Sequence, residues 1–117
     1  MASLLIVDGD RNFGQAVAIA LRLDGIAVTT ASSVEEAASL LPGAFCTYVV
    51  DCMLPDADSL IGRLASERNV RVVATGVHPE LLGSTGRRHP GVGMLQKPFR
   101  ASELHPFLPW VSPAEAP

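Results

Sequence analysis

The chain has 117 residues, of which 48% are hydrophobic and 18% charged, and its formal net charge is −3. A chain of this length and apolar content is expected to form one domain around a single core, which excludes a disordered polypeptide. The slightly acidic balance argues against a general nucleic-acid surface, so we expect no direct nucleic-acid binding.

Apolar runs of strand length recur along the chain, at residues 3–7, 26–29, 46–51, 70–75 and 92–96. After the first run, helical spacing predicts a helix over about residues 11–23, with an apolar stripe formed by Phe13, Ala16, Val17, Ala20 and Leu21. The same spacing from Val34 to Leu41 predicts a second helix, capped by Ser32 or Ser33. A third helix is predicted around residues 60–64 and a weaker fourth around 81–82.

The last two predicted helices contain residues that disfavour helical structure. The segment "HPELLGSTGRR" holds Gly83 and Gly86, each of which costs about 1 kcal/mol relative to alanine inside a helix. The segment "ASELHPFLPWV" holds Pro106 and Pro109, and the second proline should bend or end the fifth helix. We therefore expect an irregular face where these two helices pack.

Strands and helices alternate along the chain, and a strand such as "VRVVAT" is apolar on both faces. Such strands are typical of a parallel sheet that is covered by helices on both sides. The predicted fold class is therefore α/β, with a doubly wound five-stranded parallel sheet of the flavodoxin-like kind. We assign residues 1–110 to this domain. Residues 111–117, "VSPAEAP", are expected to form a disordered tail or the start of a linker.

Cysteine usage and hydropathy indicate where such a protein works. Cys46 and Cys52 lack C-x-x-C spacing, which favours reduced thiols over a disulfide framework or a zinc site. The longest apolar runs are far shorter than a membrane span, and the N-terminus lacks the pattern of a signal peptide. We therefore expect a cytoplasmic protein without membrane association.

Four polar residues follow or end the predicted strands: Asp8, Asp51, Thr75 and Lys97. In a doubly wound sheet, ligands bind at the carboxyl ends of the strands, so these side chains should share one rim. Alone, each has a structural interpretation, as a helix cap, a strand threonine or a solvated lysine. Together they predict a polar site, and two neighbouring carboxylates favour a hard cation between them, most naturally Mg²⁺.

The segments "LLIVDGD", "VVDCMLPDADSL", "VVATG" and "QKPF" occur in this order. With them the chain resembles, from Leu4 to Leu108, the receiver domains of two-component response regulators. In that family the aspartate of the third strand accepts a phosphoryl group from a histidine kinase, and Asp51 matches it, with Asp58 at the usual acidic position of the next loop. The resemblance implies a (βα)5 fold, a bacterial signalling phosphoprotein rather than an enzyme, and a switch at the face of the last two helices and the last strand.

The resemblance also implies a role for each site residue. Asp51 would be the nucleophile, Thr75 would hydrogen-bond one phosphoryl oxygen, and Lys97 would pair with another. The Lys97–Pro98 peptide would be cis. Mg²⁺ would be the cofactor, with ligands from Asp8, Asp10, Asp51 and the backbone carbonyl of Met53. The partners would be a histidine kinase or phosphotransfer protein of a phosphorelay and a downstream protein or output domain, and a homodimer is possible through the last helices.

The chain departs from the family pattern at several positions. Gly9 stands where family members usually carry a second acid that binds Mg²⁺ directly, so we expect weakened Mg²⁺ binding. Asp10 either swings inward to replace that acid or caps the helix that begins near Arg11. Met94 replaces a frequent aromatic residue of the switch. Met53 and Val77 occupy positions that tune dephosphorylation, and their apolar side chains predict a long-lived phosphoryl group.

Three alternatives remain on the sequence alone. Gly9 favours a pseudo-receiver, which would act as a protein-interaction module without phosphorylation. The pattern Asp8-Gly9-Asp10 is also similar to the D-x-D of haloacid-dehalogenase-like phosphohydrolases, but the expected threonine is Asn12, and no acid pair follows Lys97. A flavodoxin would share the fold, yet no phosphate-binding loop rich in Ser, Thr and Gly follows the first strand.

Overall fold

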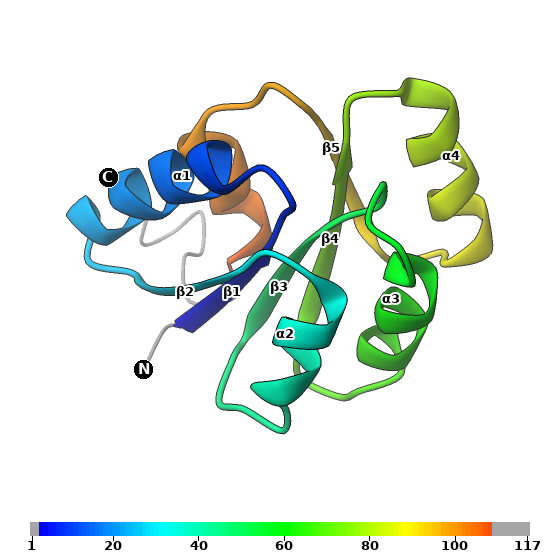
Figure 1. Ribbon diagram of the computed structural model, residues 1–117, viewed down its shortest axis with the longest axis horizontal. Coiled ribbons are helices and arrows are strands. Elements are labelled where there is room, and N and C mark those ends of the chain that lie inside the picture. The colour runs from blue at the N-terminus through cyan, green and yellow to red at the C-terminus, as the bar shows by residue number, and fades with distance from the viewer. Residues whose placement is uncertain (1–2, 109–117) are drawn as a thin grey trace.

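The computed structural model describes residues 3–108, so the predicted tail at 111–117 and the effect of Pro109 lie outside the described residues. The elements follow one another as predicted, with strand and helix alternating (Figure 1). They are β1 Ser3–Val7, α1 Arg11–Leu23, β2 Ala27–Ala31, α2 Val34–Ser39, β3 Thr47–Asp51, α3 Ala57–Ala65, β4 Arg71–Gly76, α4 Pro79–Arg88, β5 Gly93–Gln96 and the 3₁₀-helix η1 Ala101–Phe107.

The strands form one parallel sheet in the order β2-β1-β3-β4-β5, which confirms the predicted doubly wound α/β fold. The helices α2, α3 and α4 cover one face, and α1 and η1 cover the other (Figure 1). Each face has its own buried apolar cluster, one around Tyr48 and Ile61 and the other around Leu4 and Leu21. The central strands are therefore apolar on both sides, as their sequences predicted.

The first helix runs over Arg11–Leu23, as predicted. Asp10 caps it, because its Oδ1 accepts a hydrogen bond from the Phe13 N–H at 3.1 Å. The buried stripe is rotated relative to the predicted one and consists of Gly14, Val17, Ala18 and Leu21. The prediction was wrong for Ala16, which is exposed.

The fourth helix forms over ten residues despite its two glycines. Pro79 at its start has the fixed φ that a first turn requires, and Arg87 and Arg88 lie at the negative end of the helix dipole. Gly86 also makes room for Met94 of β5, since a Cβ at this position would collide with the Met94 sulfur. Met94 is 45% exposed, so it lies against α4 rather than in the core.

The fifth helical element differs from a regular helix. Residues Ala101–Phe107 form a 3₁₀-helix with Pro106 inside it, so the predicted fifth α-helix is wrong. The predicted irregularity is confirmed for this segment but is wrong for α4, which is a regular helix over Pro79–Arg88. Leu104 and Leu108 are nevertheless buried against the α1 face of the sheet. Within residues 3–108, no helix is both long and apolar enough to cross a membrane.

Candidate functional site

The sheet brings the four predicted polar residues to one rim. Asp8 directly follows β1, Asp51 ends β3, and Thr75 of β4 is the register partner of Asp51. All three are buried, with exposed fractions of 4% for Asp8, 7% for Asp51 and 1% for Thr75. Lys97 follows β5 and reaches back across the same rim. Buried charged and polar groups need partners, so the contacts of each group decide what the site can do.

Lys97 bridges the two acids. Its Nζ lies 2.8 Å from Asp8 Oδ2 and 3.2 Å from Asp51 Oδ2, and 5.2 Å from the centre of the Phe13 ring. The Lys97–Pro98 peptide is cis, as the resemblance implied. Burial alone would lower the pKa of the Lys97 ammonium, but the hydrogen bond and charge of Asp8, followed by the charge of Asp51, raise it above the ordinary 10.5. The ammonium is therefore charged at neutral pH.

The remaining carboxylate oxygens accept backbone hydrogen bonds. Asp8 Oδ1 accepts from the Asp10 N–H at 2.8 Å, and Asp51 Oδ1 accepts from the Met53 N–H at 3.0 Å. Each oxygen of the two carboxylates thus has a donor, either Lys97 or a backbone amide. This arrangement fixes the orientation of both acids.

The Thr75 hydroxyl is the exception at this rim. Its Oγ1 is buried and has no hydrogen-bond partner among residues 3–108. An unsatisfied buried hydroxyl costs about 1–3 kcal/mol. Because Thr75 lies beside Asp51 on the neighbouring strand, a ligand oxygen attached to Asp51 would find both this hydroxyl and the Lys97 ammonium close to it.

The stretch beside Asp8 has a different character. Gly9 is exposed, and a Cβ at this position would lie 3.1 Å from Cδ2 of Leu54. The side chain of Asp10 serves as the cap of α1, which is the second of the two roles considered for it. Where the family pattern has an acid, this chain therefore has an exposed glycine whose Cβ position is crowded by Leu54.

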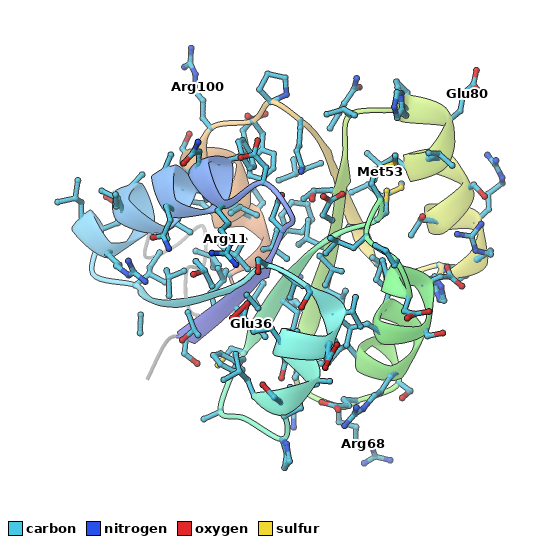
Figure 2. All side chains as sticks on the ribbon, viewed as in Figure 1. Arg11, Glu36, Met53, Arg68, Glu80 and Arg100 are labelled. Atoms are coloured by element: carbon cyan, nitrogen blue, oxygen red, sulfur yellow. The ribbon has the colours of Figure 1, made fainter. Side chains whose placement is uncertain are left out.

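Carboxylate oxygens of Asp8 and Asp51 are the ligands that Mg²⁺ prefers, so these donors suit a divalent cation in kind. They fit it poorly in number, because no group of three His, Cys, Asp or Glu side chains in the described part of the chain is placed to hold a metal ion. Lys97 also contacts both carboxylates already. The Met53 side chain, in the loop after β3, is 46% exposed (Figure 2).

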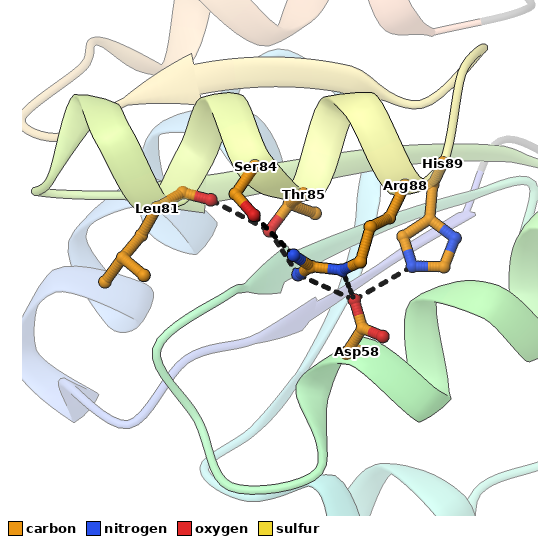
Figure 3. Close-up of polar contacts among 6 residues, drawn as sticks. All are labelled: Asp58, Leu81, Ser84, Thr85, Arg88 and His89. Atoms are coloured by element: carbon orange, nitrogen blue, oxygen red, sulfur yellow. Dashed lines mark hydrogen bonds and ion pairs between the residues drawn. The ribbon is translucent and has the colours of Figure 1, made fainter.

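Asp58 lies away from the two acids, in the first turn of α3 rather than in a loop. Its Oδ1 is 2.9 Å from the Arg88 Nε and 2.9 Å from the His89 Nε2, at the end of α4 (Figure 3). These hydrogen bonds, first that of His89 and then that of Arg88, lower the Asp58 pKa below its ordinary 3.8. No periodic pattern in the sequence predicted this contact between α3 and α4.

The surroundings of the site are partly charged and partly apolar. The side chains of Glu80 and Arg100 point away from the body of the molecule, whereas Arg68, between α3 and β4, lies at the other end of the sheet (Figure 2). By contrast, Met53 and Val77 expose apolar side chains in the loops after β3 and β4, with exposed fractions of 46% and 50%. Apolar groups therefore stand on two of the loops that border Asp51.

No family model and no curated protein matches the sequence. Solved structures do match. A response regulator protein from Burkholderia pseudomallei, which contains a phosphorylated aspartic acid, a calcium ion and citrate, superposes with a TM-score of 0.80 at 22% identity, over 94% of this chain and 68% of that one.

Two further structures match at higher identity. The receiver domain of the Francisella response regulator 1452 has a TM-score of 0.74 at 26% identity, over 89% of this chain and 90% of that one. A response regulator from Thermotoga maritima has a TM-score of 0.75 at 26% identity, over 89% of this chain and 91% of that one. The chain therefore has the fold of the response-regulator receiver domains, as its motifs predicted.

Proposed function

We propose that this domain is a phosphoacceptor receiver of a two-component pathway. Asp51 takes a phosphoryl group from a histidine kinase or a phosphotransfer protein and does not turn over a substrate as an enzyme would. The phosphorylated domain then acts on a downstream protein or output domain through the face formed by α4, β5 and η1. The cytoplasm is the compartment that this role requires.

The observation that carries the proposal is the buried Thr75 hydroxyl, which lacks a hydrogen-bond partner among the described residues and lies beside Asp51. Folding normally removes such a cost, so its presence here points to a ligand with acceptor oxygens. A phosphoryl group on Asp51 would supply such oxygens. The phosphorylated aspartic acid in the Burkholderia pseudomallei response regulator supports this interpretation.

The side chains support a simple transfer. A carboxylate oxygen of Asp51 attacks phosphorus in line, the new O–P bond forms, and the P–N bond to the donor imidazole breaks. Lys97 pairs with one phosphoryl oxygen, and the Thr75 hydroxyl donates to another. A divalent cation, most naturally Mg²⁺, would be held by Asp8 and Asp51 and would neutralise phosphoryl charge when bound.

We further propose that the phosphoryl group is long-lived. Met53 and Val77, on the loops after β3 and β4, cannot orient a water molecule for attack on the phosphorus. The aspartyl phosphate should therefore survive for much longer than seconds at neutral pH. Replacing Met53 by Asn or Glu should shorten its lifetime, and an unchanged lifetime would count against this role.

The first experiment is the intact mass of the protein after incubation with acetyl phosphate, with and without Mg²⁺. We expect the mass of one phosphoryl group to be added to the wild type and to Asp56→Asn, an exposed acid on the same loop, but not to Asp51→Asn. An adduct that survives Asp51→Asn would refute the assignment. Hydrolysis of a generic phosphomonoester with turnover would instead favour the phosphohydrolase alternative.

The second candidate function is a protein-interaction module with the same fold but without phosphorylation. Gly9 under Leu54 favours it, because this corner lacks the acid that the family pattern has. The absence of an adduct on a folded protein, both with phosphoryl donors and with excess Mg²⁺, would support this candidate.

A further inference from the structure

We propose that Lys97 is the resident cation of the two-acid site, and that Leu54 crowds the Cβ position of residue 9, so that a divalent metal binds only weakly and in competition with the Lys97 ammonium. The inference deepens the proposed function, because it concerns the same carboxylates. It does not require that Asp51 be phosphorylated.

The Lys97 ammonium already offsets part of the charge of the two acids without a metal. Two buried carboxylates repel one another, and the Lys97 Nζ contacts one oxygen of each, at 2.8 Å from Asp8 and 3.2 Å from Asp51. The backbone N–H groups of Asp10 and Met53 satisfy the other two oxygens. An incoming divalent cation must therefore displace existing donors and approach a fixed positive charge, which lowers its affinity.

The position next to Asp8 offers no further ligand. A Cβ at Gly9 would be 3.1 Å from Leu54 Cδ2, which is tighter than an ordinary van der Waals contact. Leu54 is half-buried and packs against the buried apolar cluster on the α2, α3 and α4 face, which restricts its movement. The Cβ of an acid placed at the exposed residue 9 would thus crowd the Leu54 side chain.

Asp10 does not compensate for the missing acid. Its carboxylate oxygen Oδ1 accepts the Phe13 N–H at the first turn of α1, so moving it inward would remove the helix cap. Residue 9 therefore supplies no metal ligand, and the neighbouring Asp10 caps α1 instead. Supplying a metal ligand from residue 9 requires two changes, an added acid and the removal of the Leu54 side chain.

The test is a calorimetric titration with Mg²⁺ alone, without a phosphoryl donor, on a set of variants whose fold is checked by circular dichroism. Gly9→Asp alone should change Mg²⁺ affinity by less than about threefold, and Gly9→Asp combined with Leu54→Ala should tighten it by at least about tenfold. Leu54→Ala alone is the control and should bind like the wild type. Equal affinities for the single Gly9→Asp and the double variant would overturn the role of Leu54.

The role of Lys97 is tested separately. Lys97→Met should tighten Mg²⁺ binding by at least about tenfold, since the competing charge is gone, whereas Lys97→Arg should bind as weakly as the wild type. Equal affinity of the wild type and Lys97→Met would overturn the competition. If Lys97→Met does not fold without metal, Mg²⁺-dependent folding measured by circular dichroism supports the proposal, and a failure to fold at any Mg²⁺ concentration overturns it. None of these outcomes depends on phosphorylation, so a failed phosphorylation assay and a failed metal test are distinguishable.

Discussion

The two halves of the rim differ in how their polar groups are satisfied. In the half made by Asp51, Thr75 and Lys97, a buried hydroxyl lacks a partner at a cost of about 1–3 kcal/mol. In the half made by Gly9, Asp10 and Leu54, the acid caps a helix and an apolar side chain lies beside the glycine. In the proposed function, the first half receives the oxygens of a phosphoryl group. The second is organised for folding.

Removing the Lys97 ammonium tests this contrast most severely. Lys97→Met should lower the free energy of unfolding by about 3 kcal/mol at neutral pH, because it leaves two buried carboxylates without their shared cation. Because the folded pKa of Lys97 is raised, the stabilisation is complete at neutral pH and is lost only as the pH rises through values above 10.5. Urea denaturation across pH 7 to about 11 measures both effects.

The control for this prediction is Lys97→Arg, which keeps the charge and should lose less stability than the methionine variant. Saturating Mg²⁺ should recover part of the loss in Lys97→Met and little in the wild type. A methionine variant that is as stable as the wild type would mean that the two acids do not depend on Lys97.

The unsatisfied hydroxyl in the first half predicts a mutation that stabilises the protein and impairs its function. Thr75→Val keeps the shape and removes the unpaired Oγ1, so it should raise the free energy of unfolding by about 1 kcal/mol. The same change should slow phosphoryl uptake from acetyl phosphate. Denaturation and intact-mass kinetics on one preparation measure the two effects.

Thr47→Val is the matched control, because Thr47 is also a buried strand threonine. Its Oγ1 donates to the Phe107 carbonyl at 3.3 Å, so this variant should be less stable by about 1 kcal/mol and should take up phosphoryl groups normally. Changes of opposite sign in the free energy of unfolding for Thr75→Val and Thr47→Val would show that the unpaired hydroxyl of Thr75 is destabilising. Equal signs would show that the two hydroxyls are energetically alike.

In the second half, Asp10 should behave as a helix cap. Asp10→Ala should lower the free energy of unfolding by about 1 kcal/mol, while Asp10→Ser, which keeps a capping oxygen, should lose only a fraction of that. Neither change should alter Mg²⁺ affinity by more than about twofold, because Asp10 is engaged with Phe13. A tenfold loss of Mg²⁺ affinity in both variants would restore Asp10 as a ligand.

The sequence predicted those features that depend on local pattern and on the rules of parallel sheets. Apolar runs located the strands within a few residues, and strand ends located Asp8, Asp51, Thr75 and Lys97, because all parallel strands end at the same rim. The capping role of Asp10 was one of the two roles that its place in the sequence left open. The fold and the polar half of the site were thus predictable.

Features that depend on packing between distant segments were not predictable. Leu54 over Gly9 depends on the path of the chain after β3, and the contact of Met94 with Gly86 depends on how α4 lies on β5. Residues 101–107 form a 3₁₀-helix that contains Pro106 and still buries Leu104, and helical spacing did not predict this form. Helical spacing describes which residues share a face, but it does not decide which neighbour that face meets.

A smaller effect on stability is expected away from the rim, where Asp58 links α3 to the glycine-containing α4 (Figure 3). The folded pKa of Asp58 is depressed by His89 and Arg88, so its stabilising contribution is present above the ordinary 3.8 and is lost as the pH falls through the lower folded value. Asp58→Asn should therefore be less stable than the wild type at neutral pH, and the difference should shrink in acid and in high salt. Asp56→Asn, at the exposed residue before α3, should show no such pH-dependent difference. The difference in the free energy of unfolding between Asp58→Asn and the wild type could instead stay constant from neutral pH to about pH 2. That result would mean that charge does not hold α3 to α4, and that the packing of His89 on Gly62 does so instead.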